Sequence, residues 1–71
     1  MKVRDALRHL KDGFEVQHDR GMDRFYLKGT LATSAIRISR NLFEGLEEGG
    51  HLRHAYTDGA VITYGWSGVD V

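Results

Sequence analysis

Four histidines are the residues of this sequence best suited to catalysis or metal binding. His51 and His54 are the closest pair, three positions apart, in a segment that alternates like a β-strand. Odd offsets along a strand point to opposite faces, so this pair would diverge instead of sharing an ion. The sequence contains no H-E-x-x-H motif, and zinc normally takes at least three protein ligands. We therefore predict no metal site, and we expect His54 to be a hydrogen-bonded histidine of the core.

Two glycine-containing stretches differ from the motifs that support nucleophilic or phosphate chemistry. Residues 65–68, GWSG, lack the spacing of the G-x-S-x-G motif and do not lie between a strand and a helix. Residues 44–50, EGLEEGG, follow no strand, and their glutamates would repel a phosphate. We predict a protein that is not an enzyme and that uses no cofactor.

Length and composition narrow the class of protein. The chain has 71 residues and no cysteine, so we expect one small domain over residues 1–71 without disulfides or thiolate metal sites. Charged residues interrupt the N-terminal stretch MKVRDALRHL, which is therefore expected to be neither a signal peptide nor a membrane span. We expect a cytoplasmic protein that does not enter membranes. The small core is also compatible with a homodimer.

The charges cancel overall but are unevenly distributed. Ten basic and ten acidic residues argue against a strongly basic, dedicated nucleic-acid-binding protein. Residues 1–40 hold nine Lys/Arg against five Asp/Glu, a net charge of +4, and residues 41–71 hold one against five, a net charge of −4. Two solvated faces of one fold, or two oriented partners, would both explain this polarity.

Apolar residues recur with helical spacing in two places, namely Val3, Ala6, Leu7, Leu10 and then Leu42, Phe43, Leu46. Gly13 is well placed to end the first helix in the left-handed conformation. Ser39 or Asn41 can cap the second, which ends at Gly49-Gly50. Gly45 inside that helix costs about 1 kcal/mol relative to alanine, unless a close neighbour requires it.

Period-two alternation predicts strands at residues 14–19 and 24–28, joined by the turn DRGMD, and a third within residues 30–39. In the third strand Ile36 and Ile38 are expected to point inward. With a final hairpin at 52–66, the order is α-β-β-β-α-β-β. The fold class is α+β, with an antiparallel sheet packed against two short helices, and residues 66–71 are expected to form a frayed tail.

The final hairpin, LRHAYTDGAVITYGW at residues 52–66, has a register set by its turn. A three-residue loop that pairs Tyr56 with Ala60 separates apolar from polar residues best, so we predict that register. Thr63 would then point outward. The face packed on the helices would carry Leu52, His54, Tyr56, Ala60, Ile62, Tyr64 and Trp66.

The stretches DGFEV and DRGMDRFYL, within an α-β-β-β-α beginning, resemble the small HicA-type mRNA-cleaving toxins over residues 2–48. The fold of that family is similar to double-stranded-RNA-binding domains. Its turn glycine is closely followed by the catalytic histidine, whereas Gly21 here is followed by Met22 and Asp23. The resemblance thus implies a fold without the ribonuclease residue. Residues 40–64 also resemble the helix-then-hairpin order of a winged helix.

Two functions are expected from these features. The first is a non-catalytic protein-binding module, acting stoichiometrically as an accessory or inhibitory protein on a partner such as a nucleic-acid-processing complex. In size it is similar to inhibitors encoded by phages and mobile elements, anti-CRISPR proteins among them. Its candidate contacts are Glu44, Glu47, Glu48, Tyr56, Tyr64 and Trp66. The alternative is nucleic-acid binding by the basic N-terminal half, dsRBD-like or winged-helix-like, through Arg4, Arg8, Lys11, Arg24, Tyr26, Lys28 and Arg37.

Overall fold

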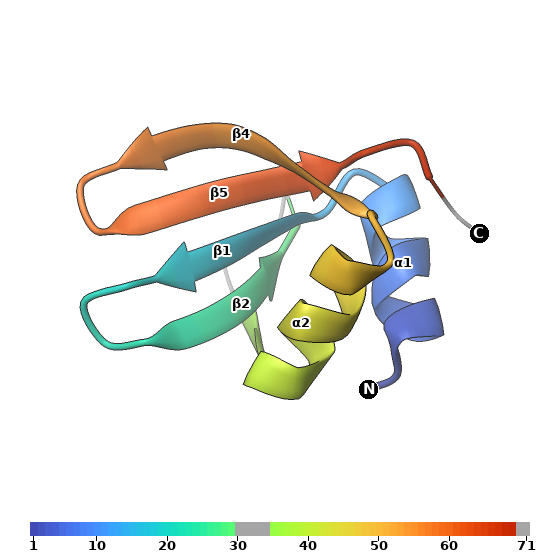
Figure 1. The fold of residues 1–71 in the computed structure, drawn as a ribbon, viewed down its shortest axis with the longest axis horizontal. Helices are drawn as coiled ribbons and strands as arrows, with labels where there is room; N and C mark the ends of the chain where they lie inside the picture. Colours follow the sequence, from blue (N-terminus) through green and yellow to red (C-terminus); the bar gives the residue numbers. More distant parts are fainter. Residues whose placement is uncertain (30–34, 70–71) are drawn as a thin grey trace.

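The computed structural model describes residues 1–29 and 35–69. Its elements follow the predicted α-β-β-β-α-β-β order and confirm the α+β class (Figure 1). They are α1 (Val3–Lys11), β1 (Glu15–Asp19), β2 (Arg24–Lys28), β3 (Ala35–Ile38), α2 (Arg40–Glu48), β4 (Leu52–Asp58) and β5 (Val61–Trp66). The part of the expected third strand that precedes residue 35 lies outside the described residues.

The five strands form one antiparallel sheet in the order β3-β2-β1-β5-β4. The chain returns from β4 so that β5 pairs with β1, which places β1 at the centre of the sheet and leaves β3 and β4 at its edges. The β4–β5 hairpin therefore extends the sheet and does not stand apart as the wing of a winged helix would. The turns β1–β2 and β4–β5 lie together at one end (Figure 1), where Arg20 donates to the carbonyl oxygen of Gly59 at 3.0 Å.

Both helices pack on one face of the sheet and share a single hydrophobic core with it. The buried members come from α1, α2 and the three strands β1, β2 and β3, and they are Ala6, Leu10, Val16, Phe25, Leu27, Ile38, Leu42, Phe43 and Leu46. Leu52, Tyr64 and Trp66 of the last two strands are half-buried against this core. Ile36, predicted to point inward, shares this face through its pairing with Leu27 but is 45% exposed.

The helix ends are fixed by local hydrogen bonds. At the end of α1, Gly13 has φ +99°, its N–H donates to the Leu10 carbonyl, and the Phe14 N–H donates to the His9 carbonyl. This pair of bonds is the Schellman motif, so the predicted helix stop at Gly13 is confirmed. At the start of α2, the Ser39 hydroxyl accepts from the Leu42 N–H at 3.1 Å. Ser39 is thus the N-cap, and Asn41 lies inside the helix.

Gly45 lies where α2 comes close to α1. A Cβ built on this glycine would lie 2.9 Å from Cγ2 of Val3 on α1. That distance is shorter than real Cβ contacts, so only glycine lets the helices meet in this way. The close neighbour that the sequence left open as an explanation for Gly45 is therefore the other helix.

The predicted hairpin register is wrong. Asp58 pairs with Val61 around a two-residue loop, in which Gly59 has φ +60°, and a β-bulge between His54 and Tyr56 shifts the pairing. On the N-terminal side of the bulge, His54 pairs with Tyr64, two positions from the predicted partner. A shift of two positions keeps the same face, so His54 stays on the helix-facing side of the sheet. On the turn side of the bulge, Tyr56 pairs with Thr63 instead of Ala60. This shift by an odd number of positions moves Tyr56 to the opposite face of the sheet.

Two further expectations differ from the structure at the C-terminal end. Residues 67–69 are tied down where a frayed tail was expected: the Ser67 N–H donates to the His51 carbonyl at 2.9 Å, and the Trp66 indole N–H donates to the Val69 carbonyl at 3.1 Å. The buried histidine is His51, whose Nδ1 donates to the Val69 carbonyl at 2.6 Å. His54 is exposed, with Nε2 2.8 Å from the Thr57 hydroxyl.

Candidate functional site

The sheet face opposite the helices, called the open face below, is not covered by any helix of the described chain. Strand register assigns its residues, because direct cross-strand partners share a face. The open face comprises Ala35, Arg37, Arg24, Tyr26, Lys28, Glu15, Gln17, Asp19, Val61, Thr63, Gly65, Arg53, Tyr56 and Asp58. It gathers Arg24, Tyr26, Lys28 and Arg37, four of the seven residues that the sequence assigned to nucleic-acid binding.

One row of side chains crosses the whole open face. Register pairs Arg37 with Tyr26, Tyr26 with Gln17, Gln17 with Thr63, and Thr63 with Tyr56, so that each strand contributes one member. We call Arg37, Tyr26, Gln17, Thr63 and Tyr56 the central row. It holds two aromatic rings, a guanidinium, an amide and a hydroxyl. It holds no carboxylate.

Two cations of the open face, Lys28 and Arg24, have the acids Glu15 and Asp19 as direct cross-strand partners. Arg24, Lys28, Arg37 and Arg53 make no ion pair with any carboxylate of residues 1–29 and 35–69. The three acids of this face, Glu15, Asp19 and Asp58, lie toward the strand ends, beyond the central row. Asp19 is already engaged in the β1–β2 turn, where one carboxylate oxygen accepts from the N–H groups of Gly21 and Met22 at 3.0 and 3.3 Å.

Thr63 is the unusual member of the central row. Its side chain is fully buried although neither α1 nor α2 lies over it, and its direct cross-strand partners are Gln17 and Tyr56. Its hydroxyl has no hydrogen-bond partner within the described chain. A buried polar group without a partner is uncommon, because it loses its hydrogen bonds to water and gains none in return.

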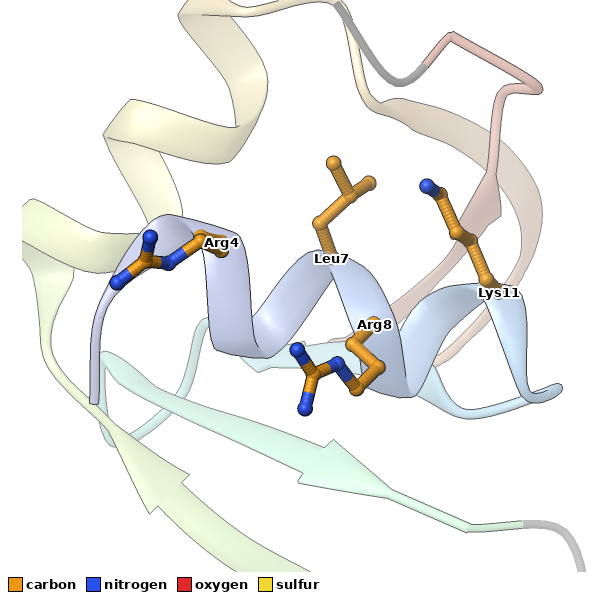
Figure 2. A pocket seen from close by; sticks show the side chains of 4 residues that line it. All are labelled: Arg4, Leu7, Arg8 and Lys11. Atoms are coloured by element: carbon orange, nitrogen blue, oxygen red, sulfur yellow. The ribbon is translucent and has the colours of Figure 1, made fainter.

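The other three predicted nucleic-acid-binding residues lie on the helix side of the molecule. Arg4, Arg8 and Lys11, together with Leu7, line an open depression of about 400 Å³ on α1. Figure 2 shows Leu7 and Lys11 pointing to the same side of α1, with Arg8 directed away from them. The Lys11 ammonium lies 5.9 Å from the centre of the Trp66 ring, a cation–π distance. These residues and the open face are separated by the sheet and do not form one surface.

The residues predicted to bind a protein are not brought together. Tyr64 and Trp66 are half-buried against the core on the helix side, whereas Tyr56 is 51% exposed on the open face. Glu44, Glu47 and Glu48 are exposed on α2. The aromatic surface expected from the hairpin is therefore split between the two faces of the sheet.

A separate polar cluster links the β1–β2 turn to the start of α2. The Asp23 carboxylate accepts from Arg40, and it accepts from His18 Nε2 at 3.3 Å. The hydrogen bond from Arg40, followed by that from His18, lowers the pKa of Asp23 below its usual value near 3.8. His18 stacks on Phe25 with ring centres 4.2 Å apart, and Asp23 has φ +53°. The cluster holds the turn in a conformation uncommon for a non-glycine residue.

Three residues of this face were not predicted from the sequence as site residues: Gln17, Thr63 and Arg53. Their strands were predicted, but the pairing of β1 with β5 has no local signal, and without it Gln17 and Thr63 are not neighbours. The bulge in β4 decides that Tyr56 faces Thr63. The position of such a bulge could not be recognised from the pattern of apolar and polar residues in this strand.

Comparisons with models of protein families, with curated proteins and with solved structures gave no match to this chain. No group of three His, Cys, Asp or Glu side chains close enough to hold a metal ion occurs among the residues described. The described part of the chain has two helices, α1 and α2, and neither is long and apolar enough to cross a membrane.

Proposed function

We propose that this protein binds single-stranded nucleic acid across the open face of its sheet. The observation that carries this proposal is the central row, which contains Tyr26, Tyr56 and Arg37 and no carboxylate. The same face holds Arg24, Lys28 and Arg53, and none of its four cations makes an ion pair among the residues that the structure describes. Aromatic rings stack on bases, and arginine and lysine neutralise phosphates. Single-strand binding without a deep groove relies on this combination.

The width of the sheet favours a single strand over a duplex. Neighbouring strands lie about 4.8 Å apart, so the outer strands of a five-stranded sheet are separated by roughly 19 Å. The major groove of B-DNA is about 12 Å wide and admits a helix or a two-stranded ribbon. The open face is too broad to enter it. A flexible strand with unstacked bases can instead lie across the face.

The neutral net charge is compatible with this function because the charges are segregated. Glu44, Glu47 and Glu48 project from α2, on the helix side of the sheet. A nucleic-acid strand bound to the open face would contact the cations of that face, which are Arg24, Lys28, Arg37 and Arg53. With three acids nearby, we expect an affinity that is modest and strongly dependent on salt.

Fluorescence anisotropy with labelled oligonucleotides of about 12 nucleotides, within the usual range of single-strand site sizes, tests the proposal. For single strands, log K falls with log salt by about 0.7 per phosphate neutralised, so four cations predict a slope near −2.8. Arg37→Ala should reduce the magnitude of this slope by about 0.7. Tyr26→Ala should weaken binding by about 1–3 kcal/mol through lost stacking.

Arg8→Ala is the matched control, because it removes an exposed arginine from the helix side. It should leave both the affinity and the salt slope unchanged. If no single strand binds at about 50 mM salt, where electrostatic binding is strongest, the proposal fails. If Arg8→Ala weakens binding and Arg37→Ala does not, the surface has been assigned to the wrong side of the protein.

A stoichiometric protein-binding role is the second proposal, supported by three glutamates exposed on α2. Glu44, Glu47 and Glu48 have helical spacing that places them near one another, where they can meet a basic partner. Affinity purification after nuclease treatment tests this role. A nuclease-resistant partner should be lost when all three residues are changed to glutamine.

A further inference from the structure

The centre of the open face carries two polar side chains with unused hydrogen-bonding capacity. Gln17 and Thr63 are direct cross-strand partners on β1 and β5, so their Cβ atoms lie about 5 Å apart. The Thr63 hydroxyl has no partner within residues 1–29 and 35–69, and no hydrogen bond is made there by the Gln17 amide. Tyr26 lies next to Gln17 on one side, and Tyr56 lies next to Thr63 on the other.

These groups match the edge of a nucleobase. A glutamine amide offers a donor and an acceptor side by side, and a hydroxyl can act as either. Glutamine pairs in this bidentate way with the N6 and N7 positions of adenine. A base stacked on either tyrosine would turn its edge toward the Gln17–Thr63 pair, because all four residues belong to the same row.

Access to Thr63 requires a small movement, and Tyr56 is placed to make it. Tyr56 is 51% exposed and lies on the edge strand β4, beside the bulge. No strand of the described chain pairs with the outer edge of β4. Because Tyr56 is the direct cross-strand partner of Thr63, a rotation of the Tyr56 side chain is the movement we expect to uncover the hydroxyl.

We propose that Gln17 and Thr63 form a base-reading subsite, opened by Tyr56, that gives the bound strand a preference for adenine. The inference rests on the proposed function. It assigns the orphaned Thr63 hydroxyl a ligand, which explains why a threonine occupies a fully buried position that valine would fill with the same shape.

Thr63→Val separates a ligand-binding role from a structural one. Valine keeps the shape and removes the unpartnered hydroxyl, so the melting temperature should be unchanged or higher. Binding to oligo-A should nevertheless weaken several-fold, with oligo-C and oligo-U affected less. Thr57→Val is the matched control, since Thr57 faces the other side of the sheet and its hydroxyl is hydrogen-bonded to His54. It should not change base preference.

Gln17→Glu provides an independent variant. A carboxylate only accepts, and it pairs with the amino group of cytosine, so the preference should shift from oligo-A toward oligo-C as total affinity falls. For the unaltered protein we expect oligo-A to bind about tenfold more tightly than oligo-C, within the range for one good bidentate pair.

The outcomes distinguish the two proposals. If no oligonucleotide binds, the proposed function fails and the subsite falls with it. If all oligonucleotides bind equally and Thr63→Val changes nothing, the function stands and the subsite is refuted. A lower melting temperature for Thr63→Val would also refute the subsite, because the hydroxyl would then have a partner inside the protein.

Discussion

Gly45→Ala tests the contact between the two helices at Val3, and two opposing effects decide whether it raises or lowers the free energy of unfolding. Alanine in a helix interior is favoured over glycine by about 1 kcal/mol. The new Cβ, however, would lie 2.9 Å from Cγ2 of Val3, well inside the separation of about 3.5–4.0 Å at which carbon atoms attract. Overpacking of this kind typically costs about 1–3 kcal/mol.

The net effect follows from these two terms. We expect Gly45→Ala to lower the free energy of unfolding by about 1 kcal/mol, which is a large share of the stability of so small a domain. In a Val3→Ala background the clashing methyl group is gone, so Gly45→Ala should raise the free energy of unfolding by about 1 kcal/mol. The coupling between the two positions is then about 2 kcal/mol, within the range for residues in contact.

Urea unfolding of the four proteins of this double-mutant cycle provides the measurement. Trp66 is the only tryptophan and packs against the core, so its fluorescence reports the transition. The slope of the free energy with urea should stay constant across the series, as required for two-state comparison. If Gly45→Ala stabilises the unaltered protein, or if the two changes simply add, the helices are not in tight contact at Gly45 and the reasoning is refuted.

Three other predictions concern the helix cap, the last turn and the charged cluster. Ser39→Ala should lower the free energy of unfolding by about 1 kcal/mol because the Leu42 N–H loses its acceptor, whereas Asn41→Ala should change it by less than about 0.5 kcal/mol. Equal losses in thermal melts of the two variants would contradict the assignment of Ser39 as the cap. Gly59→Ala should cost about 1–2 kcal/mol because its φ is +60°, while Gly65→Ala, which meets no atom and has no positive φ, should cost little; urea curves of the pair decide the point. Because Arg40 and His18 lower the pKa of Asp23, its carboxylate stabilises the fold above the unfolded value near 3.8, and this contribution is lost as the pH falls through the lowered folded pKa. Asparagine tolerates the positive φ of this position, so Asp23→Asn should melt below the unaltered protein near pH 6, and the two should converge in strong acid; a difference that persists unchanged at every pH would count against the ionic contribution.

Local patterns predicted the elements, but not how distant strands meet. The 3.6-residue and two-residue periods located all seven elements, and Gly13 ended α1 as its type predicts. The candidate site depends instead on β1 pairing with β5 and on a bulge in β4. The predicted hairpin register, which separates apolar from polar residues best, requires side chains to alternate between the two faces of the sheet without interruption through Tyr56. A single extra residue at the bulge reverses the face of Tyr56 while leaving His54 in place, and no propensity marks that residue.

The pairing of β1 with β5 also governs how this chain can fold during synthesis. Partners such as Val16 and Tyr64 lie 48 positions apart, so the central strand keeps one unpaired edge until β5 has left the ribosome. Contacts this distant in sequence pay their loop-closure entropy late and slow the approach to the native state. In that interval the exposed edge of β1 is open to pairing with other nascent chains, and Glu15 and Asp19 at its two ends disfavour such misassembly through charge repulsion.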